Sequence, residues 1–268
     1  MQLKRIPNVF KNQERSRSMK AILYIGHGTR SKQGAAEASH FIERVMRKVE
    51  APIQQLCFLE LTEPDIEEGF KRCVEQGATE ISIVPLFLLA AGHIKQDIPE
   101  ALAPLKYKYP HINVIMADPF GVQDRILNAI SEMVKLEAQQ IRSNDSILIV
   151  GRGSSDPSIL KSFESIVNGI SQRLGIKDVR VSYLAAASPS FKEGMDSICS
   201  DASGRVIVIP YLLFAGLLLS EVKREVNKKI KWGHSIIQTG TLGSHEVIQK
   251  IVIEKANGKE NASAAVSD

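Results

Sequence analysis

The chain has 268 residues, 44% hydrophobic and 24% charged, which is the composition of a globular protein with room for one large or two compact domains. No run approaches the roughly 20 apolar residues that cross a bilayer. The three cysteines form no CxxC pair, so neither a disulfide framework nor a cysteine metal site is indicated. We therefore expect a cytoplasmic protein without a membrane partner.

The first eighteen residues hold five basic side chains and one acidic side chain, so they carry the whole formal net charge of +4. Because the rest of the chain is neutral, the basic balance does not indicate a nucleic-acid partner. We predict that residues 1–18 form a basic, disordered extension and that the folded part begins near Met19.

In the first half, apolar runs alternate with amphipathic stretches. The apolar runs predict strands at 21–26, 53–60, 81–88 and 112–117. The stretches between them predict helices at 33–48, from Pro64 to about 76, and at 96–107. Strand followed by helix, repeated, predicts parallel strands joined by right-handed crossovers.

The second half repeats the first at one fixed offset. ILYIGHGTR at 22–30 aligns with ILIVGRGSS at 147–155, FLELTEPDIEEGF at 58–70 with YLAAASPSFKEGM at 183–195, and ISIVPLFLLA at 81–90 with VIVIPYLLFA at 206–215. All three pairs are 125 residues apart, and strands are expected at 146–151, 179–185, 205–213 and 235–239.

This internal duplication predicts an α/β protein of two similar lobes, each with a doubly wound parallel sheet. The N-terminal lobe spans 19–143 and carries the active site, the C-terminal lobe spans 144–258 with a degenerate site, and 259–268 form a flexible tail.

Three side chains with ligand chemistry follow the first three predicted strands. His27, Glu60 and His93 are 33 residues apart in each case, and the carboxyl ends of parallel strands share one rim, so we expect them to converge. Each alone has an ordinary alternative: a histidine between glycines can supply a turn, and Glu60 can cap or pair with the next helix.

The repeat favours the functional interpretation. At the offset of 125, His27 corresponds to Arg152, Glu60 to Ala185 and His93 to Leu218, while neighbouring glycines, prolines and apolar residues persist. A fold that needed these side chains would need them in both lobes. The alternative is that each lobe evolved its own stabilising contacts.

Two imidazoles and a carboxylate suit a borderline divalent ion such as Fe²⁺, Co²⁺, Ni²⁺ or Zn²⁺, and they also suit proton transfer near neutral pH. The sequence has no GxGxxG after a strand, no GxxxxGK[ST] and no GxSxG. Dinucleotide enzymes, nucleotide hydrolases and serine hydrolases are therefore disfavoured.

The segments ILYIGHGTR, CFLELTEPDIEEG and IVPLFLLAAGHIKQDIPE resemble the class II chelatases, in particular the two-lobed sirohydrochlorin ferrochelatases. The resemblance covers nearly everything from Met19 to about Lys255. It implies a lyase-type enzyme that inserts Fe²⁺ into sirohydrochlorin, releasing two protons to give siroheme. It also implies His27 and His93 as metal ligands, Glu60 as their acidic partner, no cofactor beyond the substrate metal, and a monomer.

A sirohydrochlorin-type ring is flat and carries several carboxylates. Near the predicted rim we expect substrate contacts from Arg30, Ser31, Leu89, Lys95 and Arg152. The apolar segments 88–91 and 212–215 are candidates for walls against the ring, although strand ends packed in the core and solvated surface charges are the ordinary alternatives.

Two other functions remain open at this point. A cobalt- or nickel-inserting chelatase could use the same scaffold, because the ligand set accepts all three ions and Co²⁺ is as suitable as Fe²⁺. A non-catalytic metal or tetrapyrrole carrier would bind the same molecules without accelerating insertion.

Overall fold

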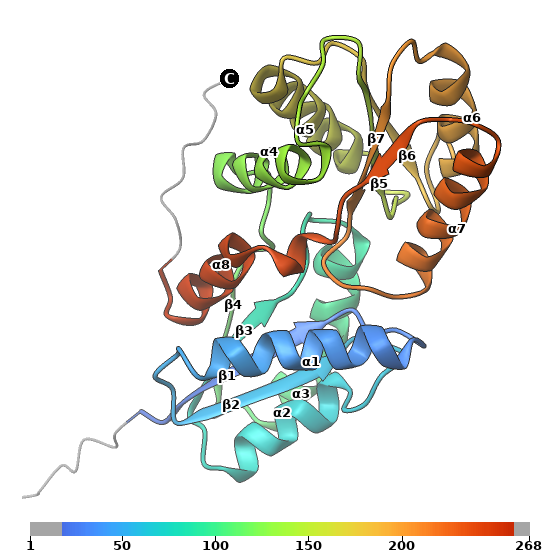
Figure 1. Ribbon diagram of the computed structural model, residues 1–268. Helices are drawn as coiled ribbons and strands as arrows, with labels where there is room; N and C mark the ends of the chain where they lie inside the picture. The colour runs from blue at the N-terminus through green and yellow to red at the C-terminus, as the bar shows by residue number, and fades with distance from the viewer. Residues whose placement is uncertain (1–17, 260–268) are drawn as a thin grey trace, which may run out of the picture.

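The computed structural model describes residues 18–259 as two α/β lobes, each built on a four-stranded parallel sheet (Figure 1). The predicted fold class is confirmed. The predicted basic extension and flexible tail lie outside the described residues except at their inner ends, residues 18 and 259. No helix within 18–259 is both long and apolar enough to span a bilayer.

The first sheet has the order β2-β1-β3-β4 with all neighbours parallel. Its elements are β1 (Lys20–Gly26), α1 (Lys32–Met46), β2 (Ile53–Phe58), α2 (Ile66–Glu75), β3 (Glu80–Pro85), the π-helical turn η1 (His93–Asp97), α3 (Ile98–Lys108) and β4 (Asn113–Met116).

The second sheet repeats this order as β6-β5-β7-β8. After β4, the chain continues through α4 (Asp124–Ala138), the last helix of the first half. The second half then runs through β5 (Ser146–Gly151), α5 (Ser158–Leu174), β6 (Val179–Tyr183), α6 (Phe191–Asp201), β7 (Val206–Tyr211), α7 (Leu217–Lys231), β8 (Ile236–Gln238), the short 3₁₀ turn η2 (Leu242–Ser244) and α8 (Glu246–Ala256).

Burial on both faces explains why the central strands are apolar throughout. In β1, Ile22 and Tyr24 belong to the cluster under α1, whereas Leu23 and Ile25 belong to the cluster under α2 and α3. Both faces of the sheet are covered, so every residue of β1 after Lys20 is buried and the usual polar alternation disappears.

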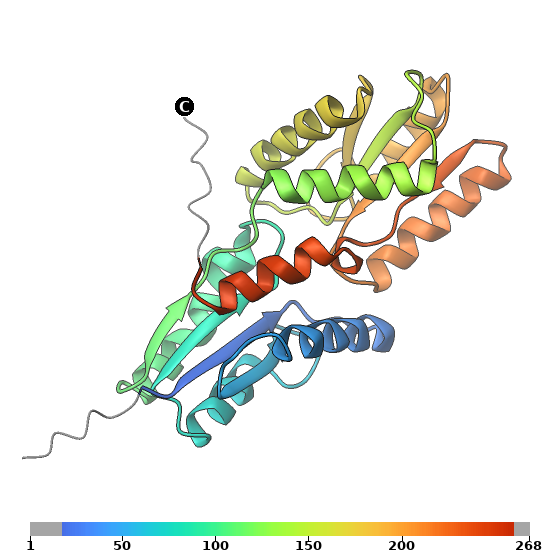
Figure 2. The same cartoon turned by 60° about the vertical axis from the view of Figure 1, so that its left-hand side comes forward.

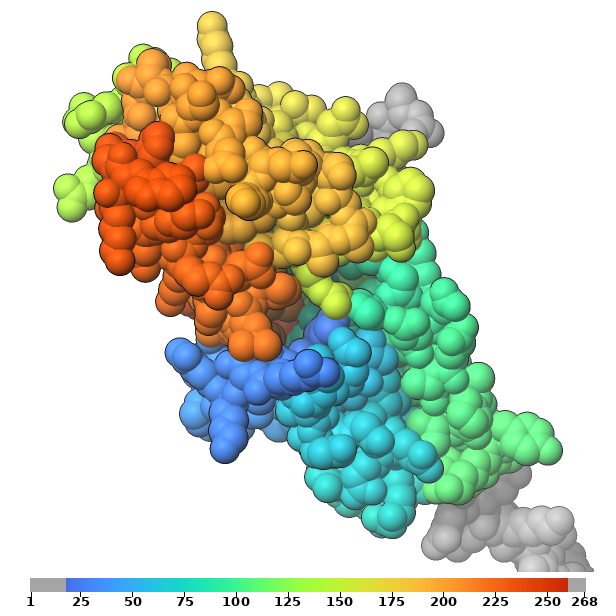
Figure 3. Space-filling view, turned by 90° about the vertical axis from the view of Figure 1, so that its right-hand side faces the viewer, coloured from blue at the N-terminus to red at the C-terminus, as the bar shows by residue number. Residues whose placement is uncertain are grey.

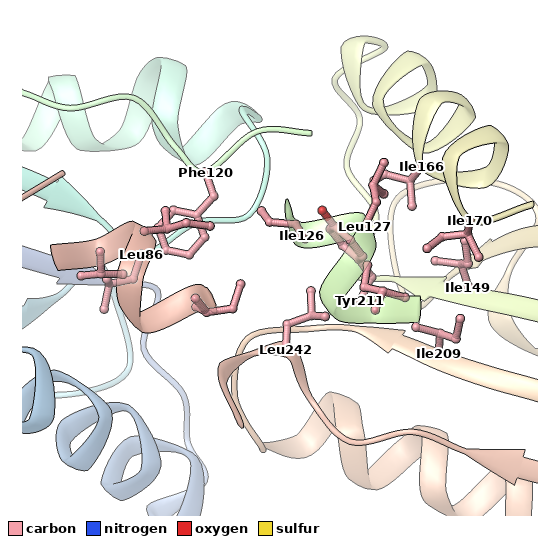
Figure 4. Packing of buried hydrophobic residues seen from close by; sticks show 14 of the residues in the cluster. Leu86, Phe120, Ile126, Leu127, Ile149, Ile166, Ile170, Ile209, Tyr211 and Leu242 are labelled. Atoms are coloured by element: carbon pink, nitrogen blue, oxygen red, sulfur yellow. The ribbon is translucent and has the colours of Figure 1, made fainter. Parts of the chain in front are cut away.

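The last helix of each half packs on the sheet of the other half. Helix α4 contacts α5, β7 and β8, whereas α8 contacts α1 and β3 (Figures 1 and 2). One hydrophobic cluster therefore runs through both lobes, from Leu86 and Phe120 across Leu127 to Tyr211 and Leu242 (Figure 4). A core shared in this way fixes how the two lobes face each other.

The repeat is also visible in the loop after the first strand of each lobe. Gly28 and Gly153 have φ values of 91° and 88°, and an added Cβ would lie 1.6 Å and 1.8 Å from the carbonyl oxygens of Glu60 and Ala185. Only glycine fits both the conformation and the space. The main chain is thus the same in both lobes at positions where the functional side chains differ.

Candidate functional site

The carboxyl ends of β1, β2 and β3 bring the three predicted side chains together. His27 follows β1, Glu60 lies two residues beyond β2, and His93 begins η1 after β3. His27 Nε2 lies 3.1 Å from His93 Nε2 and 3.5 Å from Glu60 Oε1. Residues far apart in sequence thus form one compact group at the rim of the sheet.

Hydrogen bonds to the two Nδ1 atoms determine which tautomer each imidazole adopts. His27 Nδ1 lies 3.1 Å from the Gly28 carbonyl oxygen, and His93 Nδ1 lies 2.5 Å from Asp97 Oδ2. Because both partners accept, each Nδ1 carries the proton, and the two Nε2 atoms direct lone pairs toward one point.

The separation of these two nitrogens suits a shared divalent ion. Metal–nitrogen bonds of about 2.1 Å at angles of roughly 90–109° place two ligand nitrogens about 3.0–3.4 Å apart, and 3.1 Å falls in that range. Within residues 18–259, no three His, Cys, Asp or Glu side chains are arranged to enclose an ion. We call the two Nε2 atoms of His27 and His93 the metal seat. Two nitrogen ligands leave the other coordination positions of an ion open for further ligands.

The second lobe places a cation directly at this seat. Arg152, the counterpart of His27 in the repeat, has Nη1 2.6 Å from His93 Nε2. Burial in the cavity wall, and next the positive charge of Arg152, lower the pKa of His27 from 6.5 to about 4. His27 is therefore a neutral imidazole at physiological pH, the form that binds metals and accepts protons.

A cavity of about 490 Å³ opens from the imidazole pair and is lined by both lobes. Leu88 and Leu89 contribute from the first lobe, and Leu213 and Phe214 contribute from the second. In the space-filling view, a recess marks the junction where the second lobe lies on the first (Figure 3). The walls of the cavity are largely apolar and carry a few charged groups, which suits a flat apolar ligand that has polar edges.

The residues expected to bind substrate fall into two groups. Arg30, Leu89 and Arg152 line the cavity. Ser31 and Lys95 are not among its lining residues. The Ser31 hydroxyl accepts from the Gly34 N–H at the start of α1, and Lys95 Nζ pairs with Asp156 Oδ2 at 2.6 Å across the lobes.

Several groups at the site were not predicted from the sequence. Asp97 accepts a hydrogen bond from His93, and the i, i+4 spacing of these residues in a helical segment was a signal that could have identified it. Phe87 lies with its ring centroid 6.1 Å from that of His27. Leu217 to Leu219, at the start of α7, also line the cavity, but nothing in the sequence distinguishes them from core residues.

Fold and site together define a two-lobed α/β protein with a metal-type imidazole pair at the end of a cavity between its lobes. The model of the CbiX family matches residues 21–137 and 146–258, one match in each lobe. The chain therefore belongs to the CbiX family, and its resemblance to the class II chelatases is confirmed.

Individual relatives share most of the chain. The sirohydrochlorin ferrochelatase of Priestia megaterium is 42% identical over 87% of this chain and 88% of its own. The sirohydrochlorin cobaltochelatase of the same organism is 30% identical over 89% of this chain and 79% of its own. Among solved structures, SirB from Bacillus subtilis with Fe³⁺ is 34% identical and superposes with a TM-score of 0.78 over 90% of this chain and 95% of that one.

Proposed function

We propose that this chain is a sirohydrochlorin ferrochelatase, an enzyme that inserts Fe²⁺ into sirohydrochlorin and releases two protons. The observation that carries the proposal is the pair of Nε2 atoms, 3.1 Å apart, facing a cavity with apolar walls. The ferrochelatase at 42% identity supports the choice of ring and reaction. The substrates are sirohydrochlorin and a divalent metal, and no separate cofactor takes part.

The two imidazoles hold the incoming ion while the ring lies against the apolar walls. Insertion exchanges ligands on the ion for four ring nitrogens, and two pyrrole N–H protons must leave. The Nε2 atoms of His27 and His93 are suitable proton acceptors once they release the ion. Glu60 has 45% of its side chain exposed, so it can pass a proton from His27 to water.

The ring carboxylates require cations at the edges of the cavity. Arg30 and Arg152 line it from opposite lobes, and each can bind a carboxylate through two parallel hydrogen bonds. Lys95 contributes differently: its ammonium group binds Asp156, in the loop before α5, and Ser158, the first residue of α5, and so connects η1 to the second lobe.

Iron is the proposed metal, and cobalt is the alternative favoured by a specific observation. Two imidazoles accept either ion, and the cobaltochelatase relative is 30% identical over a similar share of the chain. Nickel is chemically possible on the same ligands. Insertion rates measured with each ion under anaerobic conditions decide which metal the enzyme prefers. A much faster insertion of cobalt than of iron would make cobalt the proposed metal.

The decisive experiment mixes protein, metal-free sirohydrochlorin and Fe²⁺ and follows the absorbance change of the ring. We expect His93→Ala to lower the insertion rate by at least about 10²-fold, because it removes a metal ligand and a proton acceptor. His111→Ala is the matched control, since His111 is exposed and precedes the amino end of β4. Binding without acceleration over the spontaneous rate would instead indicate a carrier.

We also propose that the protein works as a monomer in the cytoplasm. One chain supplies both walls of the cavity, which supports a complete site without a second copy. Its three described cysteines are free and buried, which suits a reducing compartment. The molar mass in solution, measured by light scattering, tests the first statement.

A further inference from the structure

Arg152 occupies the lone pair that a metal ion would need. Its Nη1 lies 2.6 Å from His93 Nε2, and that nitrogen is the one left unprotonated by the bond from Nδ1 to Asp97. An imidazole lone pair accepts one donor or binds one ion, and a guanidinium does not lose its proton in proteins. A metal ion can therefore take His93 only after Arg152 has moved away.

The guanidinium is also available to another partner. Within residues 18–259, Arg152 is in no ion pair shorter than 4 Å, although the charge of Glu60 attracts it from farther away, and its hydrogen bond to His93 uses only one of its five donors. The side chain is exposed where it reaches into the cavity lining. A carboxylate offers it two parallel charge-assisted hydrogen bonds, which a neutral imidazole cannot match.

We propose that Arg152 is a displaceable cation that couples the binding of the two substrates. In the empty protein it masks His93. A carboxylate of the bound tetrapyrrole draws it away and exposes the lone pair for the metal. This inference rests on the proposed function and adds a coupling to it: a bound ring prepares His93 for the metal.

The coupling has a physical consequence that works in both directions. If the ring increases the affinity for the metal by some factor, then the metal increases the affinity for the ring by the same factor. The second lobe thus takes part in the reaction at the position where the repeat replaced His27 with Arg152. The residue that corresponds to His27 in the second lobe thus masks the site of the first lobe.

The test measures two affinities that do not depend on turnover. Co²⁺ binding to the ring-free protein is followed by calorimetry, and binding of metal-free sirohydrochlorin is followed by fluorescence. For Arg152→Ala we expect about 10-fold tighter Co²⁺ binding, because the hydrogen bond that competes with the metal for His93 is lost. We also expect about 10-fold weaker ring binding, because the hydrogen bonds to a ring carboxylate are lost. Opposite changes for the two substrates are not expected from general damage to the fold.

Two controls separate masking from a general charge effect. Arg224→Ala removes an exposed arginine of α7, and we expect both affinities to stay at the wild-type value. Arg152→Lys keeps the charge with a shorter reach, so Co²⁺ should still bind more tightly than in the wild type. The gain in Arg152→Ala should also persist near 1 M salt, where charges are screened beyond about 3 Å.

Unchanged or weaker Co²⁺ binding in Arg152→Ala would overturn the proposal, as would an equal gain in Arg224→Ala. A wild-type protein that binds both substrates but does not accelerate insertion would refute the chelatase function instead. Because these affinities are measured separately from turnover, the two failures are distinguishable.

Discussion

At the residue scale, the orientation of His93 depends on Asp97. The carboxylate lies 2.5 Å from Nδ1, which directs Nε2 to the metal seat and makes the ring a better ligand. Carboxylates in this arrangement typically contribute about 10- to 100-fold to metal affinity. Asp97 is therefore a positioning residue that acts through His93.

We expect Asp97→Ala to weaken Co²⁺ binding by at least about 10-fold, as measured by calorimetry. Asp97→Asn should lose less, because its amide oxygen can still accept from Nδ1. Glu100→Gln is the matched control, since Glu100 bonds to the exposed Gln96 one helical turn away. Equal affinities in Asp97→Ala and the wild type would show that packing alone orients His93.

The lowered pKa of His27 predicts a pH dependence of stability. The group has a pKa of about 4 in the folded protein and about 6.5 when unfolded, so between these values the unfolded chain binds more protons. Its contribution is complete above about pH 6.5 and is lost as the pH falls toward 4.

Urea unfolding at pH 7.5 and pH 5 measures this effect. We expect His27→Gln to lose less stability than the wild type over this interval, because its side chain does not titrate. His111→Gln should follow the wild-type dependence. An identical pH dependence in His27→Gln and the wild type would contradict the assigned shift.

At the element scale, α8 has a role that its place in the sequence does not suggest. Its apolar face packs against β3 and α1 of the first lobe, and Ile248, Ile251 and Val252 are fully buried. Arg125 of α4 also pairs with Glu254 of α8 at 2.6 Å. The last helix therefore covers the sheet on whose rim the site lies.

We expect Ile251→Ala to lower the free energy of unfolding by about 2–5 kcal/mol, the usual cost of truncating a buried isoleucine. Leu160→Ala, at a position with 53% exposure on α5, should change it by less than about 0.5 kcal/mol. Hydrogen exchange shows which part of the protein is destabilised. The amides of β1 and β3 should lose protection in Ile251→Ala, although the substitution is in the C-terminal helix.

At the scale of the whole molecule, the exchange of α4 and α8 makes the lobes depend on each other. Residues 19–143 alone would lack α8 and would expose the face of α4 that carries Ile130 and Val134. The two sequence repeats therefore do not coincide with the two packed lobes, because each repeat contributes its last helix to the opposite lobe.

We expect a fragment of residues 19–143 to show no cooperative unfolding, because its shared core is cut. A hybrid that joins residues 19–121 through a flexible linker to 240–259 restores α8 and omits α4, and it should unfold cooperatively in urea. Cooperative unfolding of 19–143 with native-like circular dichroism would show that the exchanged helices are dispensable.

Much of the fold was predictable because burial leaves a pattern in the sequence. The strands and their order along the chain were predicted correctly, but several were predicted too long. The apolar run from 81 was expected to continue as strand to 88, whereas β3 ends at Pro85. Phe87 and Leu88 are apolar because they line the cavity, and the pattern cannot distinguish a cavity wall from a sheet.

The sequence by itself determined the duplication, the parallel α/β architecture and the three side chains at the strand ends, because strand periodicity and topology place such residues on one rim. Only the tertiary structure decided which neighbours reach that rim. Ser31 and Lys95 bind partners outside the cavity lining. Asp97 accepts a hydrogen bond from His93, and Arg152 of the second lobe donates one to His93. Contacts between distant segments depend on how the lobes pack, and the periodicity of α4 and α8 indicates a buried face without indicating which lobe covers it.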